Sequence, residues 1–298
     1  AAWHLKNAGV PSTIYEASPR RGGRTYSGRD VVGPGLVTEL GGEFIDSIHD
    51  DMLGLVEHFG LEMIDVQGPA EHDLVPDAFY FEGRHFSEQE VVDAFRPYAE
   101  RMAADLEPLG EDTTYKDAGG AEALDALSIA AYLDRLGMSG WLRKLFEVAY
   151  VTEYGAELDD QSALNLLYMI ETDLANDDFA VFGASDERYK IVGGNQSVAD
   201  ALAADLGTEP LLGHRLVALR HTGRAYGLYF NTGDDEKTHQ VIADVVILAL
   251  PFSMLRKVNL EIELPGLKRR AIDELPMGNC TKLMMGLRSR PWREQGFG

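Results

Sequence analysis

The chain opens with a pattern that predicts a helix followed by a strand. Residues 1–8 read as the end of a helix, which Gly9 closes as its cap. The next short segment, residues 12–15, predicts a strand that ends in Glu16. A helix, a tight turn and a strand ending in an acidic residue form the second half of a βαβ unit. On this interpretation the first strand and its Gly-rich turn precede residue 1.

Two further stretches combine apolar segments with glycine pairs. Residues 37–40 predict a strand that runs directly into Gly41 and Gly42. Helical spacing follows over residues 52–59, with Asp46 or Ser47 as the expected N-cap. Glycines after a strand let a flat ligand lie against the main chain, although most such pairs are simply turns.

The middle of the chain has a different pattern, a hairpin followed by helices. Residues 79–86 predict the hairpin, and helical spacing follows at 87–110, 127–137, 140–155 and 159–173. Ser87 with Glu90 forms a capping-box pattern, and Leu127–Ser128 predicts a second cap. We expect the large side chains here to be core rather than pocket lining: Tyr132, Trp141, Phe146, Tyr150, Tyr168 and Met169.

Composition and charge narrow the classes of protein and partner. The 298 residues are 45% hydrophobic and carry a formal net charge of −22, which argues against nucleic acid as a partner. The apolar runs are too short to span a bilayer and no leader opens the chain, so we expect a soluble protein and favour the cytoplasm. One cysteine and eight scattered histidines argue against a disulfide or a metal site.

Glu16 and Arg24 have a shared chemical interpretation. A carboxylate at the end of a strand accepts hydrogen bonds from ribose hydroxyls. Arg24 follows Gly22–Gly23, where the backbone lets a pyrophosphate approach the guanidinium closely. The alternative is a surface turn in which a glutamate and an arginine pair weakly, and these residues alone leave both interpretations open.

Five segments together carry a resemblance to a known family. Residues 15–27 (YEASPRRGGRTYS) and 38–47 (TELGGEFIDS) are similar to the flavin-containing amine oxidases, which include monoamine, polyamine and L-amino acid oxidases. Residues 185–207 resemble the family's strand, Gly-Gly and helix, and residues 245–258 its strand and proline turn. Residues 276–287 resemble the family's lysine-bearing strand. The segments occur in the family's order.

The resemblance implies an α/β fold with α+β insertions. A Rossmann-like FAD domain would comprise residues 1–70 and 185–250, and a substrate domain with a helical portion residues 71–184 and 251–298. Its GxGxxG strand-turn and its C-terminal FAD segment would lie outside this chain.

Carried over position by position, the resemblance also implies a set of site residues. Glu16 would bind the adenosine ribose, Arg24 the phosphate and ribose region, and Val217 the adenine through its main chain. The flavin would be lined by the backbone of Leu40, Gly41, Gly42 and Glu43. From the residues alone, Val217 is equally an ordinary core position of a hairpin that continues to Phe230.

Lys282 is the expected catalytic residue. It lies in an apolar segment whose alternation places it on one face with Cys280 and Met284. The pattern alone favours an edge-strand or snorkelling lysine. The family's lysine holds a water against flavin N5, and with the resemblance the catalytic interpretation is preferred.

The implied reaction is the oxidation of an amine by FAD, with dioxygen reduced to hydrogen peroxide. Phe44 stands where the L-amino acid oxidases place a carboxylate-binding arginine, so we favour amines without a carboxylate. An L-amino acid oxidase, a carotenoid desaturase or protoporphyrinogen oxidase relative, and a non-catalytic flavoprotein scaffold are the alternatives. The expected partners are a small amine and O2, with a homodimer left open, and no metal is expected.

Overall fold

The computed structural model describes residues 1–109, 113–176, 178–233 and 235–298, and these form two compact units. The first comprises Ala1–Phe44, Asp51–Ile64 and Lys190–Met277, and the second Ile45–Asp50, Asp65–Tyr189 and Gly278–Gly298. These breaks lie near the boundaries predicted at 70 and 185, whereas residues 251–277 pack in the first unit. The roles assigned to the two domains stay predictions.

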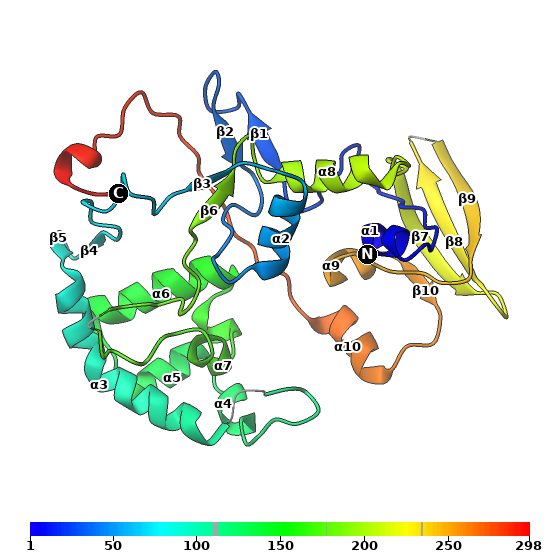
Figure 1. The fold of residues 1–298 in the computed structure, drawn as a ribbon. Coiled ribbons are helices and arrows are strands. Elements are labelled where there is room, and N and C mark those ends of the chain that lie inside the picture. The colour runs from blue at the N-terminus through cyan, green and yellow to red at the C-terminus, as the bar shows by residue number, and fades with distance from the viewer. Residues whose placement is uncertain (110–112, 177, 234) are drawn as a thin grey trace. The chain divides into compact units, whose positions relative to one another are not determined.

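The first unit is a mixture of short helices and two sheets (Figure 1). Its helices are α1 (Ala2–Asn7), α2 (Asp50–His58), α8 (Gln196–Leu206), α9 (Phe252–Leu255) and α10 (Gly266–Glu274). Its strands are β1 (Ser27–Arg29), β2 (Val37–Glu39), β7 (His214–His221), β8 (Tyr226–Thr232), β9 (Asp235–Ala243) and β10 (Asn259–Glu261). Two strands at the unit boundary, β3 (Met63–Asp65) and β6 (Tyr189–Ile191), pair with each other.

The larger sheet of the first unit has the strand order β10-β7-β8-β9. β7, β8 and β9 form an antiparallel meander, and β10 pairs in parallel with β7. Apolar side chains alternate along β7 and β8, so one face buries Leu219, Leu228 and Phe230. The hairpin predicted from residue 214 to residue 230 is confirmed.

The first predicted strand is reduced to a single bridge. Tyr15 pairs in parallel with Leu211, whose N–H donates to Ile14 and whose carbonyl accepts from Glu16, both at 2.9 Å. Within residues 245–258, where a strand and a proline turn were predicted, residues 245–249 pair with no strand among the described residues, and Val245 is 78% exposed. Both predictions of a regular strand are wrong for the described chain, because a ladder needs a partner edge that these segments do not find.

The second unit is mainly helical. It contains a hairpin of β4 (Phe79–Phe81) and β5 (Arg84–Phe86), then α3 (Glu88–Leu106), α4 (Glu122–Asp125), α5 (Ile129–Leu136), α6 (Gly140–Tyr154) and α7 (Ala163–Leu167). Three 3-10 turns complete it: η1 (Glu107–Leu109), η2 (Leu158–Asp160) and η3 (Arg293–Gln295). No helix in the described ranges has both the length and the apolar character needed to cross a bilayer.

Local signals set the helix ends of the second unit. Ser87 and Glu90 form the predicted capping box at the start of α3. Ser128 caps α5 by accepting the N–H of Ala131, also as predicted. In the first unit, by contrast, α2 begins at Asp50, so the N-cap expected at Asp46 or Ser47 is wrong.

An aromatic core fills the second unit. Tyr132, Phe146 and Tyr150 are fully buried, and Trp141 stacks on Phe86 with ring centroids 4.0 Å apart. Met169 packs against the same core, but Tyr168 is 43% exposed, which contradicts its predicted core position. Its hydroxyl contacts Thr113 instead.

Candidate functional site

Three glycine pairs of the first unit gather around the β1–β2 hairpin: residues 22–23, 41–42 and 193–194. The N–H of Gly42 donates to the carbonyl of Arg24 at 3.2 Å, which joins the first two pairs. The third pair precedes α8, whose first N–H, that of Gln196, donates to Ser27 Oγ at 3.1 Å. The three glycine motifs singled out in the sequence therefore form one structure.

Three of these glycines have no room for a side chain. A Cβ on Gly22, whose φ is +93°, would lie 2.6 Å from the carbonyl oxygen of Thr25. A Cβ on Gly41 would lie 1.9 Å from the carbonyl oxygen of Arg24. Gly194 has φ of +103°, and its Cβ would lie 2.3 Å from Ser27 Oγ. Real Cβ atoms do not approach that closely, so glycine is required at these positions. Gly22 and Gly41 pack directly on main chain, and Gly194 packs on the Ser27 side chain.

A buried glutamate lies at the centre of this structure. Glu39, the last residue of β2, is 5% exposed and faces Ser27 across the hairpin. The Ser27 hydroxyl lies 3.1 and 2.8 Å from its two carboxylate oxygens, and the N–H of Asn195 donates to Oε1 at 2.9 Å. No basic side chain forms an ion pair with Glu39 in the ranges described. The hydroxyl on β1 and the N–H at the start of α8 together offset the cost of burying the carboxylate.

The side chain of Asn195 fixes the loop that follows Glu39. Its Nδ2 donates to the carbonyls of Gly42 at 3.2 Å and Glu43 at 2.7 Å. Its Oδ1 accepts the N–H of Ile191 at 3.0 Å. One buried amide thus ties β6 to the 40–43 loop, which consists of the four predicted flavin-lining residues.

Glu43, the last residue of the loop, forms an ion pair with Lys190 of β6. The carboxylate of Glu43 lies 2.6 Å from Lys190 Nζ, which also sits 4.4 Å above the ring centroid of Phe44. The positive charge beside Phe44 is therefore already paired with a neighbouring carboxylate.

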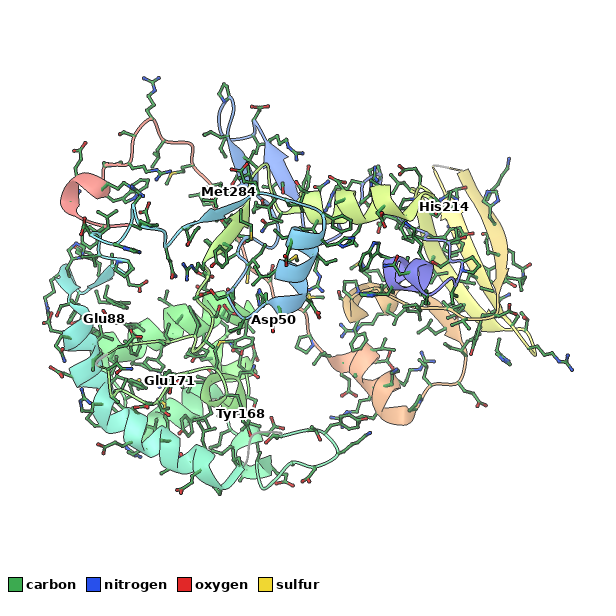
Figure 2. The ribbon with its side chains drawn as sticks, in the orientation of Figure 1. Asp50, Glu88, Tyr168, Glu171, His214 and Met284 are labelled. Carbon is green, nitrogen blue, oxygen red and sulfur yellow. The ribbon has the colours of Figure 1, made fainter. Side chains whose placement is uncertain are left out.

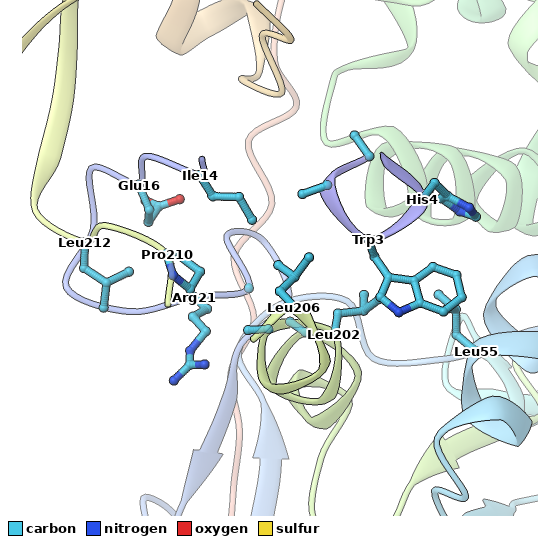
Figure 3. A pocket seen from close by; sticks show the side chains of 15 residues that line it. Trp3, His4, Ile14, Glu16, Arg21, Leu55, Leu202, Leu206, Pro210 and Leu212 are labelled. Atoms are coloured by element: carbon cyan, nitrogen blue, oxygen red, sulfur yellow. The ribbon is translucent and has the colours of Figure 1, made fainter. Parts of the chain in front are cut away.

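Glu16 lines a cavity of about 320 Å³ in the first unit (Figure 3). One carboxylate oxygen accepts the N–H of Ser18 at 2.7 Å, which leaves the other oxygen available to a ligand. The remaining lining is largely apolar and comes from α1, α8 and the segments near residues 14 and 210, including Trp3, Ile14, Leu202, Leu206 and Leu212. The arrangement suits one polar anchor in an apolar pocket.

The arginines of the glycine-rich turn differ in what they do. Arg20 donates to the carbonyl of Gly23 at 2.6 Å and lies over the ring of Tyr26, so it braces the turn. Arg21 lines the cavity and lies 3.3 Å from Glu209. Arg24 is exposed, and its guanidinium makes no hydrogen bond or ion pair with any other residue that the structure describes. The Glu–Arg surface pair considered as an alternative does not form between Glu16 and Arg24 in this structure.

Val217 occupies a β-bulge. The ladder between β7 and β8 passes from Leu216 directly to Ala218 and omits Val217. The parallel ladder with β10 begins only at Ala218. Val217 therefore has no paired residue in either ladder, and bulges of this kind are over-represented next to functional sites.

Lys282 belongs to the second unit, whereas the seven predicted cofactor residues all belong to the first. Residues 276–287 form no strand, and Lys282 is exposed (Figure 2 labels Met284 in the same segment). The predicted lysine-bearing strand is therefore wrong as secondary structure. Main chain anchors the start of this segment, where the N–H of Asn279 donates to the carbonyl of Gly155 at 2.8 Å. The catalytic role of Lys282 stays a prediction.

Glu39, Ser27 and Asn195 were not among the residues selected from the sequence. Glu39 and Ser27 stand in two of the five segments that carry the family resemblance, and Asn195 follows a glycine pair in a third. Only the hairpin register and the packing of α8 bring them together. A charged residue two positions before a glycine pair was the one signal available.

The residues present fit a dinucleotide. The carboxylate of Glu16 lines an apolar cavity and has one oxygen available to a ligand. The exposed guanidinium of Arg24 follows a glycine pair, and the close-packed glycines leave main chain without side chains to cover it. These features stand on one unit, so no element of the other is needed to form them.

Comparison with known proteins agrees with a dinucleotide-binding site. The pattern of the family described as flavin containing amine oxidoreductase matches residues 1–298. A flavin-containing amine oxidase of Danio rerio is 23% identical over 307 residues, covering 100% of this chain and 56% of the relative. An L-amino acid dehydrogenase of Synechocystis is 22% identical over 315 residues, covering 100% and 63%.

A solved structure shares the fold. Putrescine oxidase, in a structure bound to putrescine, superposes with a TM-score of 0.70 at 18% identity, over 99% of this chain and 65% of that one. The chain thus spans between about half and two thirds of the length of the proteins it matches. Because the family pattern covers every residue, the chain belongs to the flavin-containing amine oxidoreductase family.

Proposed function

We propose that this chain belongs to an FAD-dependent amine oxidase. Membership of the family implies an FAD cofactor. The observation that carries the proposal is the convergence of the three glycine pairs on a buried Glu39, beside a cavity lined by Glu16. The matched proteins are longer than this chain, so the activity is proposed for the whole protein.

When bound, FAD would supply the redox chemistry: uptake of a hydride from the α-carbon of a neutral amine, then transfer of two electrons with two protons to O2, which gives hydrogen peroxide. We assign the binding of the adenosine ribose to the spare oxygen of Glu16, and that of the phosphates to the exposed guanidinium of Arg24. Val217 would present its bulged main chain to the adenine. Residues 40–43 would lie against the flavin, and Lys282 would hold a water beside it.

The substrate class follows from the surroundings of Phe44. An amino acid substrate needs a cation for its carboxylate, and the cation nearest to Phe44 is already paired with Glu43. We therefore favour amines that lack a carboxylate, as the name of putrescine oxidase indicates for that relative. The similarity to an L-amino acid dehydrogenase keeps an L-amino acid oxidase as the second candidate.

The test is an absorption spectrum of the purified full chain followed by a peroxide assay. We expect a flavin spectrum, and peroxide from polyamines or aryl amines rather than from L-amino acids. Peroxide from L-amino acids alone would favour the second candidate. Flavin without peroxide from any amine would favour a desaturase-like enzyme or a scaffold, and a protein that binds no flavin would contradict the proposal.

Lys282→Met tests the assignment of the catalytic lysine. The variant should retain the flavin spectrum but show slower flavin reduction or reoxidation in stopped-flow measurements, because the proposed water loses its anchor. Unchanged rates would remove Lys282 from the mechanism without affecting the cofactor assignment. The homodimer and the cytoplasmic location stay predictions.

A further inference from the structure

We propose that Asn195 is a positioning residue that orients the peptide groups of residues 42–44 toward the flavin. The inference rests on the proposed function, because it assumes that the 40–43 loop lies against FAD. Asn195 itself is 5% exposed and is not assigned any contact with the cofactor.

The orientation follows from the planarity of the peptide bond. In a trans peptide, the carbonyl of one residue and the N–H of the next point in opposite directions. Both the Gly42 and Glu43 carbonyls are turned toward Asn195 Nδ2. The N–H groups of Glu43 and Phe44 must therefore point away from Asn195, which makes them two main-chain donors with a fixed direction.

Asn195 can impose this direction because hydrogen bonds fix its own side chain and main chain. Its Oδ1 accepts the Ile191 N–H, and its own N–H donates to the buried carboxylate of Glu39. Both hydrogens of Nδ2 are used by the two loop carbonyls. The side chain thus has no second rotamer that keeps its partners, and the loop inherits that rigidity.

The backbone at Gly42 needs hydrogen bonds from other residues to fix its conformation. A Cβ on Gly42 would meet no atom within 4 Å, so packing does not limit the conformation of this residue. Glycine has the widest choice of backbone conformations. Two hydrogen bonds restrain its peptide groups: one from its own N–H to the carbonyl of Arg24, and one from Asn195 to its carbonyl.

Asn195→Asp is the sharpest substitution. It preserves size and the acceptor toward Ile191, but it replaces the two donors with an oxygen that faces two carbonyl oxygens. It also places a second carboxylate beside Glu39. The loop carbonyls would be repelled, so their peptides would lose the direction that Asn195 imposes.

The second unit contains a matched control. Gln161 is 4% exposed, and its Nε2 donates to the carbonyls of Tyr150 at 3.0 Å and Ala156 at 2.6 Å. Gln161→Glu removes the same kind of buried amide from two carbonyls, in the unit that contains none of the predicted cofactor-binding residues. It reproduces the general destabilisation without disturbing the loop.

The experiment compares FAD binding by the apoproteins of wild type, Asn195→Asp and Gln161→Glu, from the quenching of flavin fluorescence. We expect both variants to melt at a lower temperature than wild type. Only Asn195→Asp should weaken FAD binding, by about tenfold or more, and shift the visible flavin band and the reduction potential. Asn195→Ser, which retains one donor, should have an intermediate FAD affinity and serves where Asn195→Asp does not fold.

The outcomes separate this inference from the proposed function. Wild type that binds FAD, with unchanged affinity, band position and potential in the Asn195 variants, would overturn the positioning role and leave the function intact. An equal loss of FAD affinity in Gln161→Glu would overturn it as well, since the effect would then be general destabilisation. Wild type that binds no FAD would overturn the proposed function and this inference with it.

Discussion

The two compact units are stabilised by different means. In the first, the centre of the candidate site is polar: Ser27, Glu39 and Asn195 are each 5% exposed, and Ser27 and Asn195 both donate hydrogen bonds to Glu39. In the second, the centre is made of large apolar and aromatic side chains, among which Phe95 and Phe146 are fully buried. One region packs main chain on main chain, and the other packs side chain on side chain.

The difference teaches how a binding loop is kept rigid without bulk. Large side chains would fill the space that a flat cofactor needs, so the first unit uses glycines and a hydrogen-bonded carboxylate. The aromatic core of the second unit stabilises through buried area and tolerates no ligand in its interior. Substitutions in the two regions should therefore differ in kind as well as in size.

Phe146→Ala should have the largest effect on stability. Phe146 is fully buried on α6 and packs against Phe95 and Phe179. Removing the ring should lower the free energy of unfolding by about 3–5 kcal/mol, measured by urea denaturation. Its control is Val148→Ala on the same helix, where 59% exposure predicts a change below about 0.5 kcal/mol.

The same variant sharpens the comparison through its effect on the cofactor. Molecules of Phe146→Ala that remain folded should bind FAD within about twofold of wild type, since the predicted cofactor residues lie in the other unit. A large loss of affinity in the folded protein would show that the aromatic core also shapes the site.

Gly41→Ala should have the next largest effect, and it should lower both the stability and the FAD affinity. The added methyl would lie 1.9 Å from the carbonyl of Arg24, so the hairpin must shift, at about 2–3 kcal/mol of stability. Apoprotein denaturation gives the stability, and flavin fluorescence gives the expected loss of FAD affinity. Gly42→Ala is the matched control, because no atom lies within 4 Å of its Cβ and the apoprotein should be nearly unchanged. Equal stabilities of the two variants would contradict the close packing described for Gly41.

The sequence predicted local structure well wherever the signal was itself local. The capping box at Ser87–Glu90, the cap at Ser128 and the hairpin at 79–86 each depend on residues a few positions apart. The glycine pairs were recognised for the same reason. Their convergence was not predicted, because it depends on the register of β1 with β2 and on where α8 begins.

Strands that need distant partners were predicted less well. The segments at 12–15, 245–249 and 276–287 have strand-like composition but form no ladder, since composition does not supply a neighbouring edge. Asn195 illustrates the same limit for the candidate site. Its partners lie 152 and 153 residues away in the chain, so no spacing rule could have selected it.

The smallest expected effect on stability comes from the different surroundings of a carboxylate in the two regions. Glu39 in the first unit receives donors only, whereas Glu88 at the start of α3 (Figure 2) meets another acid. Desolvation and a hydrogen bond with Asp178 raise the pKa of Glu88 above its ordinary value near 4.5. A raised carboxyl pKa adds stability at low pH that is lost as the pH rises through the folded-state value.

Glu88→Gln should therefore stabilise the second unit at pH 7 relative to wild type, with an advantage that shrinks as the pH falls toward about 4.5. Because Glu88 is exposed, the difference should be below about 0.5 kcal/mol, and melting temperatures across this range measure it. Glu90, two residues along, is the opposite case. Its bond from the Ser87 N–H and its pair with Arg84 lower its pKa, so its contribution is present above the unfolded value and lost in acid. Glu90→Gln should be less stable than wild type at pH 7 and approach it as the pH falls, and slopes of the same sign for the two variants would contradict the contrast.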